Sequence, residues 1–254
     1  MRSLTPCLFA AASFLATGGV HAEDLSVSAA LGFESRYVFR GIQFAETSIQ
    51  PAVTATKGGF HPGAWFNLPV GDDDFVVPAN GEELDLVAGY TTPLGEKFKL
   101  DIGVTYYLFP EEMSGFGDFY HEDGDGLGVN TLEPYVSLSL DIPLSPVVTV
   151  YRDFMYDTFT FQGTASHSIP IAEKTSFDLS GLIGYVADDA IGADYLYGAA
   201  SIGVSYAFSD DSKVYAGARY GGSDLPGGSL AKNSIAGTTQ SGGLWWGAGL
   251  STAF

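Results

Sequence analysis

The chain has 254 residues and is strongly acidic, with 11 lysines and arginines against 30 aspartates and glutamates. That balance argues against nucleic-acid binding, which needs a basic surface. With 33 glycines, 14 tyrosines, 18 phenylalanines and no run of 18 apolar residues, the sequence predicts an all-β protein without a transmembrane helix.

Residues 1–22 have the parts of a cleavable secretory signal peptide. Arg2 supplies the positive charge, the apolar run covers 7–16, and Val20-His21-Ala22 is a small-residue cleavage site. The mature chain is then 23–254, and loss of Arg2 lowers its net charge from −19 to −20. Cys7 leaves with the signal, which excludes disulfides. An exported chain of this kind is a soluble periplasmic domain, a secreted β protein or an outer-membrane barrel.

The mature sequence alternates between apolar and polar residues nearly throughout. The first expected strand, 25–40, alternates for about 16 residues, well beyond the ~5–6 residues of a typical soluble strand. The other expected strands are 48–56, 60–68, 83–91, 98–108, 131–140, 146–155, 159–171, 175–185, 195–208, 213–220 and 243–254. Because a membrane strand needs roughly 9–11 residues and bacterial barrels have an even strand number, we predict a transmembrane antiparallel up-and-down β-barrel of about 12 strands.

Connection lengths and aromatic positions support the barrel. The expected connections alternate between short inner turns and long outer ones, with a tight outer hairpin at Tyr156–Thr158 as the exception. Aromatic residues on the apolar face form two girdles around an aliphatic band, as in membrane barrels. The outer girdle is predicted to contain Tyr37, Phe39, Tyr106, Phe154, Phe159, Phe161, Tyr185, Tyr220 and Trp246, and the inner girdle Phe60, Tyr90, Phe98, Phe177, Tyr206, Phe208 and Phe254.

The stretch SRYVFRGIQFAETSIQPAV resembles the entry motif of the TorF-type family of outer-membrane porins. Ser35, Tyr37 and the run Phe39–Gly41 match it, as does the pair Pro51-Ala52. Gln43 comes earlier than the family pattern has it. The resemblance implies an outer-membrane β-barrel and no established substrate.

Charged side chains of the lumen face gather in the outer half of the expected barrel. Strand alternation puts Arg36 and Arg40 on the same face as Glu34, and small residues on the last strand would leave room for them. The set of five acids and three arginines is Glu34, Arg36, Arg40, Glu83, Asp85, Glu133, Asp153 and Arg219. It is interpreted as a pore constriction with a transverse field, or alternatively as ion pairs that fill and brace the barrel.

Enzyme and metal chemistry find little support. His61 is expected in a turn, and His167 faces lipid while its serine neighbours do not. No three histidines or carboxylates have zinc spacing, and the acidic segment 122–133 departs from the EF-hand pattern. We therefore predict no enzyme activity, no metal site and no cofactor.

The predicted function is a porin of the cell outer membrane for passive diffusion of small polar solutes or ions. Acidic outer connections predict a preference for cations; their mouth residues are Asp72, Asp73, Asp74, Glu111, Glu112, Asp118, Glu122, Asp123 and Asp125. Expected partners are lipids, lipopolysaccharide and the outer-membrane assembly machinery, for which the aromatic terminus Phe254 is the signal. The alternative is a non-conducting structural or adhesive barrel that acts through its long outer loops.

Overall fold

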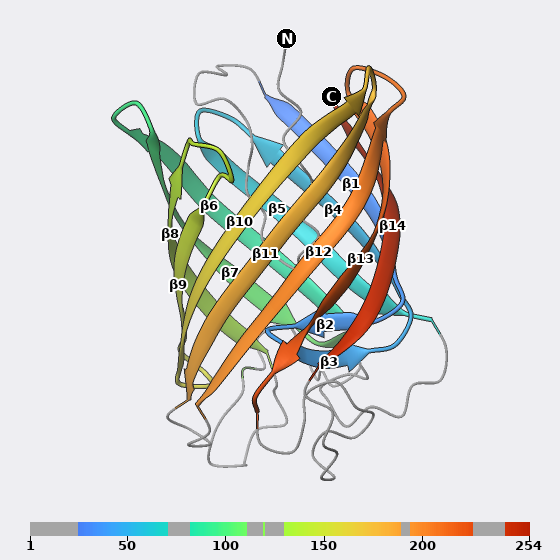
Figure 1. The fold of residues 1–254 in the computed structure, drawn as a ribbon. Helices are drawn as coiled ribbons and strands as arrows, with labels where there is room; N and C mark the ends of the chain where they lie inside the picture. The colour runs from blue at the N-terminus through green and yellow to red at the C-terminus, as the bar shows by residue number, and fades with distance from the viewer. Residues whose placement is uncertain (1–24, 71–81, 111–118, 120–129, 189–193, 226–241) are drawn as a thin grey trace.

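The computed structural model describes residues 25–70, 82–110, 119, 130–188, 194–225 and 242–254. Twelve antiparallel strands close into a barrel, in which β1 pairs with β4 on one side and with β14 on the other (Figure 1). The barrel strands are β1 (Ser26–Glu34), β4 (Ser48–Thr56), β5 (Phe60–Pro69), β6 (Glu83–Leu94), β7 (Phe98–Leu108), β8 (Thr131–Leu140), β9 (Val147–Asp153), β10 (Thr158–Ala172), β11 (Thr175–Asp188), β12 (Tyr195–Ala207), β13 (Ser212–Ser223) and β14 (Gly242–Ala253). The predicted architecture is confirmed.

The described part of the chain contains no helix that is long and apolar enough to cross a membrane.

The two faces of the barrel wall differ as the alternation predicts. Along β6, Asp85 is fully buried in the lumen, whereas Tyr90 on the other face is 53% exposed. The outward face carries large exposed apolar side chains on every strand, among them Leu31, Ile102, Val148, Ile183 and Leu244. Because successive side chains of a strand point to opposite faces, period two is enough to separate an apolar exterior from a polar interior.

The tight hairpin between β9 and β10 is also confirmed, since Thr158 pairs with Asp153. Asp157 adopts a left-handed conformation with φ 53°. Arg152, whose parity points outward, forms an ion pair with Asp157 and stacks 4.5 Å from the ring centre of Phe159. The turn therefore places this charge at the barrel end and gives it a partner.

The first expected strand is too long. β1 ends at Glu34, and the chain turns inward to form a separate hairpin of β2 (Tyr37–Phe39) and β3 (Ile42–Ala45). Figure 1 shows this pair lying across the barrel at the end opposite the start of β1. We call that end the outer end, the other the inner end, and residues 37–45 the inserted hairpin.

The aromatic girdles need one correction that follows from this turn. Tyr37 and Phe39 were expected to face lipid, but Tyr37 is 1% exposed and both pack inside the barrel. Tyr106 was also expected in the outer girdle, but it is 8% exposed and packs against Phe119 with ring centres 5.4 Å apart. Other girdle residues are exposed on the outer face as predicted: Phe154, Phe159, Phe161, Tyr220 and Trp246 near the outer end, and Phe60, Tyr90, Phe98, Tyr206, Phe208 and Phe254 near the inner end.

Candidate functional site

The inserted hairpin reverses direction through a two-residue turn. Phe39 pairs with Ile42, and the residues between them, Arg40 and Gly41, have φ values of 46° and 77°. Two consecutive positive φ angles are those of a type I′ turn, whose twist suits a hairpin and which glycine adopts readily at its second position. Arginine is unusual there, and such a conformation persists only where surrounding contacts hold it.

The base of the hairpin is fixed to β5 and β6. Tyr37 packs against Trp65, with ring centres 5.4 Å apart, and against Ala45. Its hydroxyl donates a hydrogen bond of 2.7 Å to Glu83 Oε2. Burial, followed by the nearby carboxylates of Glu83 and Asp85, raises the pKa of Tyr37 well above its ordinary value. The phenol therefore stays protonated and remains a donor to Glu83.

The turn of the hairpin is fixed to β7, β8 and β9 through the guanidinium of Arg40. Its Nη2 lies 2.7 Å from Glu133 Oε1, and the Tyr107 hydroxyl donates to the same oxygen at 2.9 Å. The guanidinium also lies 4.8 Å from the ring centre of Tyr151 and 4.7 Å from that of Phe39. Arg40 is thus neutralised by a buried carboxylate and held between aromatic rings.

The far side of the turn meets the opposite wall of the barrel. A Cβ on Gly41 would lie 2.7 Å from the carbonyl oxygen of Gly222 on β13 and 2.8 Å from Cβ of Tyr197 on β12. Ile42 packs against the cluster of Val186, Tyr195 and Tyr197. The hairpin therefore crosses the lumen from β5 to β13, and Gly41 is required both by its positive φ and by this close approach.

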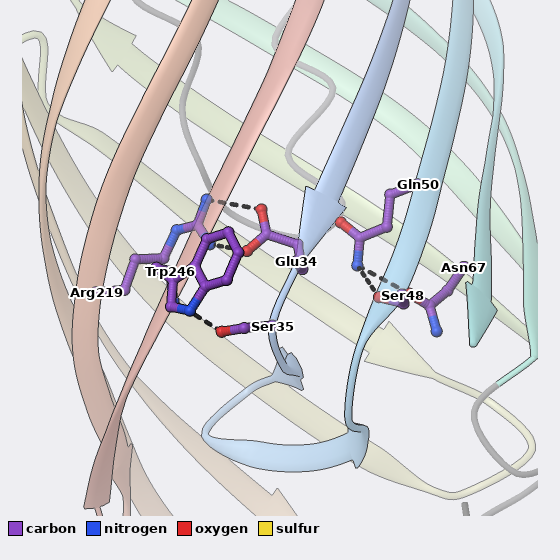
Figure 2. A network of polar contacts seen from close by, with 7 residues as sticks. All are labelled: Glu34, Ser35, Ser48, Gln50, Asn67, Arg219 and Trp246. Atoms are coloured by element: carbon purple, nitrogen blue, oxygen red, sulfur yellow. Dashed lines mark hydrogen bonds and ion pairs between the residues drawn. The ribbon is translucent and has the colours of Figure 1, made fainter. Parts of the chain in front are cut away.

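The end of β1 is held by a second buried ion pair. Both terminal nitrogens of Arg219 donate to the carboxylate of Glu34, with Nη2 2.9 Å from Oε1. Figure 2 shows this pair beside the contact from the Trp246 amide to Ser35 Oγ. A Cβ on Gly247 would lie 2.4 Å from Glu34 Oε1. The small residues of β14 were expected to accommodate Arg36 and Arg40, but here Gly247 makes room for Glu34 instead.

The structure joins four of the eight predicted constriction residues in two ion pairs, Arg40 with Glu133 and Arg219 with Glu34. Glu83 accepts from Tyr37, and Asp85 beside it is fully buried with no hydrogen bond to either oxygen among the described residues. Asp153 instead caps the β9–β10 turn, where it accepts from the amides of Met155 and Tyr156 at 2.9 Å. The set therefore forms several separate contacts, of which those of Glu83 and Glu133 hold the inserted hairpin.

Arg36 is the exception among the three arginines. Among the described residues its guanidinium makes no ion pair or hydrogen bond, and its Nη1 is buried without a partner. It lines a cavity of about 240 Å³ beside the inserted hairpin, and residues of β1, β4, β5, β7 and β9–β14 also contribute to the lining.

Two features were not predicted from the sequence: the inward turn after β1, and a cluster of polar side chains around His61 in the inner half of the barrel. The dipeptide Arg40-Gly41 between two aromatic stretches was the available hairpin signal, because glycine suits a turn with positive φ. His61, expected in a turn, lies in β5 with its Nε2 2.8 Å from Asp101 Oδ2, and Thr91 donates to the same oxygen at 2.6 Å. A period-two reading of β5 places His61 on the lumen face.

The predicted acidic mouth and the 122–133 segment are only partly testable. Asp72, Asp73, Asp74, Glu111, Glu112, Asp118, Glu122, Asp123 and Asp125 lie outside the described residues. Within the described ranges, no group of three or more histidines, cysteines, aspartates or glutamates could hold a metal ion.

Comparisons with known proteins agree with the barrel. A family model described as "Bacterial protein of unknown function (Gcw_chp)" matches residues 20–240. No curated protein matches. Among solved structures, the NanC porin superposes with a TM-score of 0.54 at 13% identity, over 90% of this chain and 99% of that one.

Two further solved structures resemble the chain equally well. The KdgM porin gives a TM-score of 0.52 at 11% identity, over 90% of this chain and 99% of that one. The COG4313 outer membrane channel from Pseudomonas putida F1 gives 0.53 at 10% identity, over 90% and 95%. At these identities the likeness establishes the shared barrel fold.

Proposed function

The chain belongs to the Gcw_chp family of bacterial proteins of unknown function, and because that family assigns no activity, we propose from the barrel itself that it is an outer-membrane channel for small polar solutes or ions. The observation that carries the proposal is a closed twelve-strand barrel with an apolar exterior and a polar lumen that contains a cavity. The porin and channel structures that share its fold support it. The resemblance of the stretch SRYVFRGIQFAETSIQPAV to TorF-type porins supports the same proposal.

The exterior suits a lipid environment and little else. Ile183 on β11, Leu196 on β12 and Leu244 on β14 are each at least half exposed, and aromatic residues flank such aliphatic side chains near both ends. Soluble monomers rarely expose apolar patches larger than a few hundred Å², so a continuous apolar band requires a partner. Outer-membrane lipids are the partner that a closed barrel fits, because closure leaves no unpaired strand edge in the hydrocarbon.

Planar-bilayer recording tests the channel directly. Full-length mature protein, folded as judged by heat-modifiable gel mobility, is expected to give reproducible single-channel steps. Silence from folded protein would overturn the channel and favour the second candidate.

A preference for cations is the finer part of the proposal. The outer connections carry most of the net negative charge of the sequence, and an acidic mouth concentrates cations and repels anions. Screening weakens this over about 10 Å at 0.1 M salt. The reversal potential across a salt gradient is therefore expected to indicate cation preference that declines as salt rises, and a potential of the opposite sign at low salt would exclude it.

The second candidate is a barrel that does not conduct. The inserted hairpin favours it, because it crosses the lumen and contacts both walls. Such a barrel would brace the envelope, or act as an adhesin through long acidic loops that bridge to lipopolysaccharide through divalent ions. Bilayer silence together with adhesion of expressing cells is the result expected of it.

A further inference from the structure

The cavity beside the inserted hairpin differs from an ordinary packing defect in size and lining. Its volume of about 240 Å³ far exceeds the roughly 10–15 Å³ that one water molecule needs. Aromatic rings of Tyr151, Tyr197, Tyr215 and Trp245 contribute to its wall, together with the amide side chain of Gln162. Aromatic faces with a few polar groups are the usual composition of a small-molecule site.

Among the described side chains that line this cavity, charge is unbalanced by one guanidinium. Arg40 and Arg219 also line it, but their partners Glu133 and Glu34 neutralise them. Arg36 has no acidic partner among the described residues, and its Nη1 is buried without donating a hydrogen bond to any of them. A buried donor left unpaired costs free energy, so its persistence in a cavity requires an explanation.

We propose that this cavity binds a small solute carrying one carboxylate and several hydroxyl groups, with the carboxylate on the guanidinium of Arg36. The inference rests on the proposed channel function and names the chemistry of its solute. A guanidinium matches a carboxylate through two parallel N–H···O bonds. The hydroxyl-bearing body of the solute would lie against Tyr151 and Tyr215, whose rings offer apolar faces with polar tips.

The count of charges favours a carboxylate over a phosphate ester. One unpaired guanidinium balances one negative charge, whereas a phosphate monoester carries about −1.5 to −2 at neutral pH. The acidic mouth acts on ions approaching from outside, so a cation-preferring pore and one internal carboxylate site are compatible.

Equilibrium dialysis of the detergent-folded mature chain against radiolabelled D-glucuronate, D-glucose and glucose 6-phosphate tests this without any conduction. Glucuronate and glucose share the ring and differ in the carboxylate. We expect saturable glucuronate binding that is roughly tenfold tighter than glucose binding, as one charge-assisted pair provides. The assignment would be overturned if glucose bound as tightly as glucuronate, or if glucose 6-phosphate bound more tightly than glucuronate.

Two variants locate the site. Arg36→Gln keeps the size and polarity of the side chain and is expected to abolish the preference for glucuronate over glucose, whereas Arg36→Lys should retain part of it. Lys213→Gln, at the inner end, is the matched control and should leave both affinities unchanged. A preference for glucuronate over glucose that survives in folded Arg36→Gln protein would overturn the role of Arg36. If that variant does not fold, the comparison of the two sugars on the wild-type protein tests the site.

The outcomes also separate this inference from the channel itself. Bilayer silence with intact glucuronate binding would overturn the proposed channel and leave the site. Single-channel currents without selective glucuronate binding would overturn the site and leave the channel.

Discussion

The two walls of the lumen are built from different residues and do different things. The wall of β5–β9 is dense, with buried carboxylates at Glu83, Asp85 and Glu133 and large rings such as Tyr107. The wall of β11–β14 has small lumen residues, among them Gly217 and Gly247, and it borders the cavity. The first wall holds the inserted hairpin through Tyr37 and Arg40, and the second contributes more of the residues that line the cavity beside it.

This difference indicates how a twelve-strand barrel can contain a selective site. A barrel of this size lies between small barrels filled by their own side chains and porins with an aqueous channel. Here a hairpin from the first outer connection packs on the carboxylate-rich side, and the cavity lies beside it. The inserted hairpin and the cavity beside it are thus two features of one asymmetric lumen.

Removing the inserted hairpin should have the largest effect. Replacement of residues 36–46 by Asn-Gly joins Ser35 to Thr47 through a type I′ turn, and Glu34 and Ser48 already pair at that position. With the inserted hairpin removed from the outer lumen, single-channel conductance is expected to rise severalfold. Unchanged conductance of folded variant protein would place the constriction elsewhere.

Breaking the Arg40 contact should release the turn while leaving the hairpin in the chain. Arg40→Ala removes one partner of a buried ion pair, which typically costs on the order of 3–5 kcal/mol. We expect flickering currents in bilayers and a lower urea midpoint. The double variant Arg40→Met with Glu133→Leu, which leaves no unpaired charge, should recover much of the stability. No recovery would indicate that the rings around Arg40, rather than the charge pair, hold the turn.

On the opposite wall, Gly247→Ala tests whether the small residues are needed for space. The added Cβ would lie 2.4 Å from Glu34 Oε1, so the pair with Arg219 must shift. Overpacking of this kind costs about 1–3 kcal/mol, measured as a lower free energy of unfolding in urea. Gly163→Ala is the matched control, because its Cβ would find its nearest atom at 4.0 Å. Equal effects from both would mean that backbone propensity, not space, sets the cost.

A smaller loss is expected from Tyr37→Phe at the base of the hairpin. The variant keeps the ring on Trp65 but leaves the buried carboxylate of Glu83 without its donor, a loss of roughly 1–3 kcal/mol. Urea unfolding gives the measurement. Tyr206→Phe on the exposed outer face serves for comparison and should change stability little.

The smallest effect on the lumen should come from Phe254→Ala, which tests the proposed assembly signal. The Phe254 side chain is 81% exposed, and its backbone exchanges hydrogen bonds with Val27 at 2.8 and 3.2 Å, which the substitution retains. We expect less folded protein in outer-membrane fractions by heat-modifiable mobility, with unchanged conductance of the channels that do insert. Wild-type folded levels would remove the side chain as a signal.

The sequence by itself determined the barrel. Alternation is a local property with a period of two, so each strand shows which face is apolar without knowledge of its neighbours. Eleven of the twelve expected strands agree with the structure to within a few residues, and the tight turn near Asp157 follows from the short gap between two alternating segments.

Only the tertiary structure decided where the first strand ends and what fills the lumen. Tyr37 and Phe39 keep the parity of the strand before them, so the pattern offers no reason to leave it. The reason lies far along the chain: Tyr37 meets Glu83 across 46 positions and Arg40 meets Glu133 across 93. These partners come together only when the barrel closes, and buried contacts of that kind outweigh a local preference for continued strand.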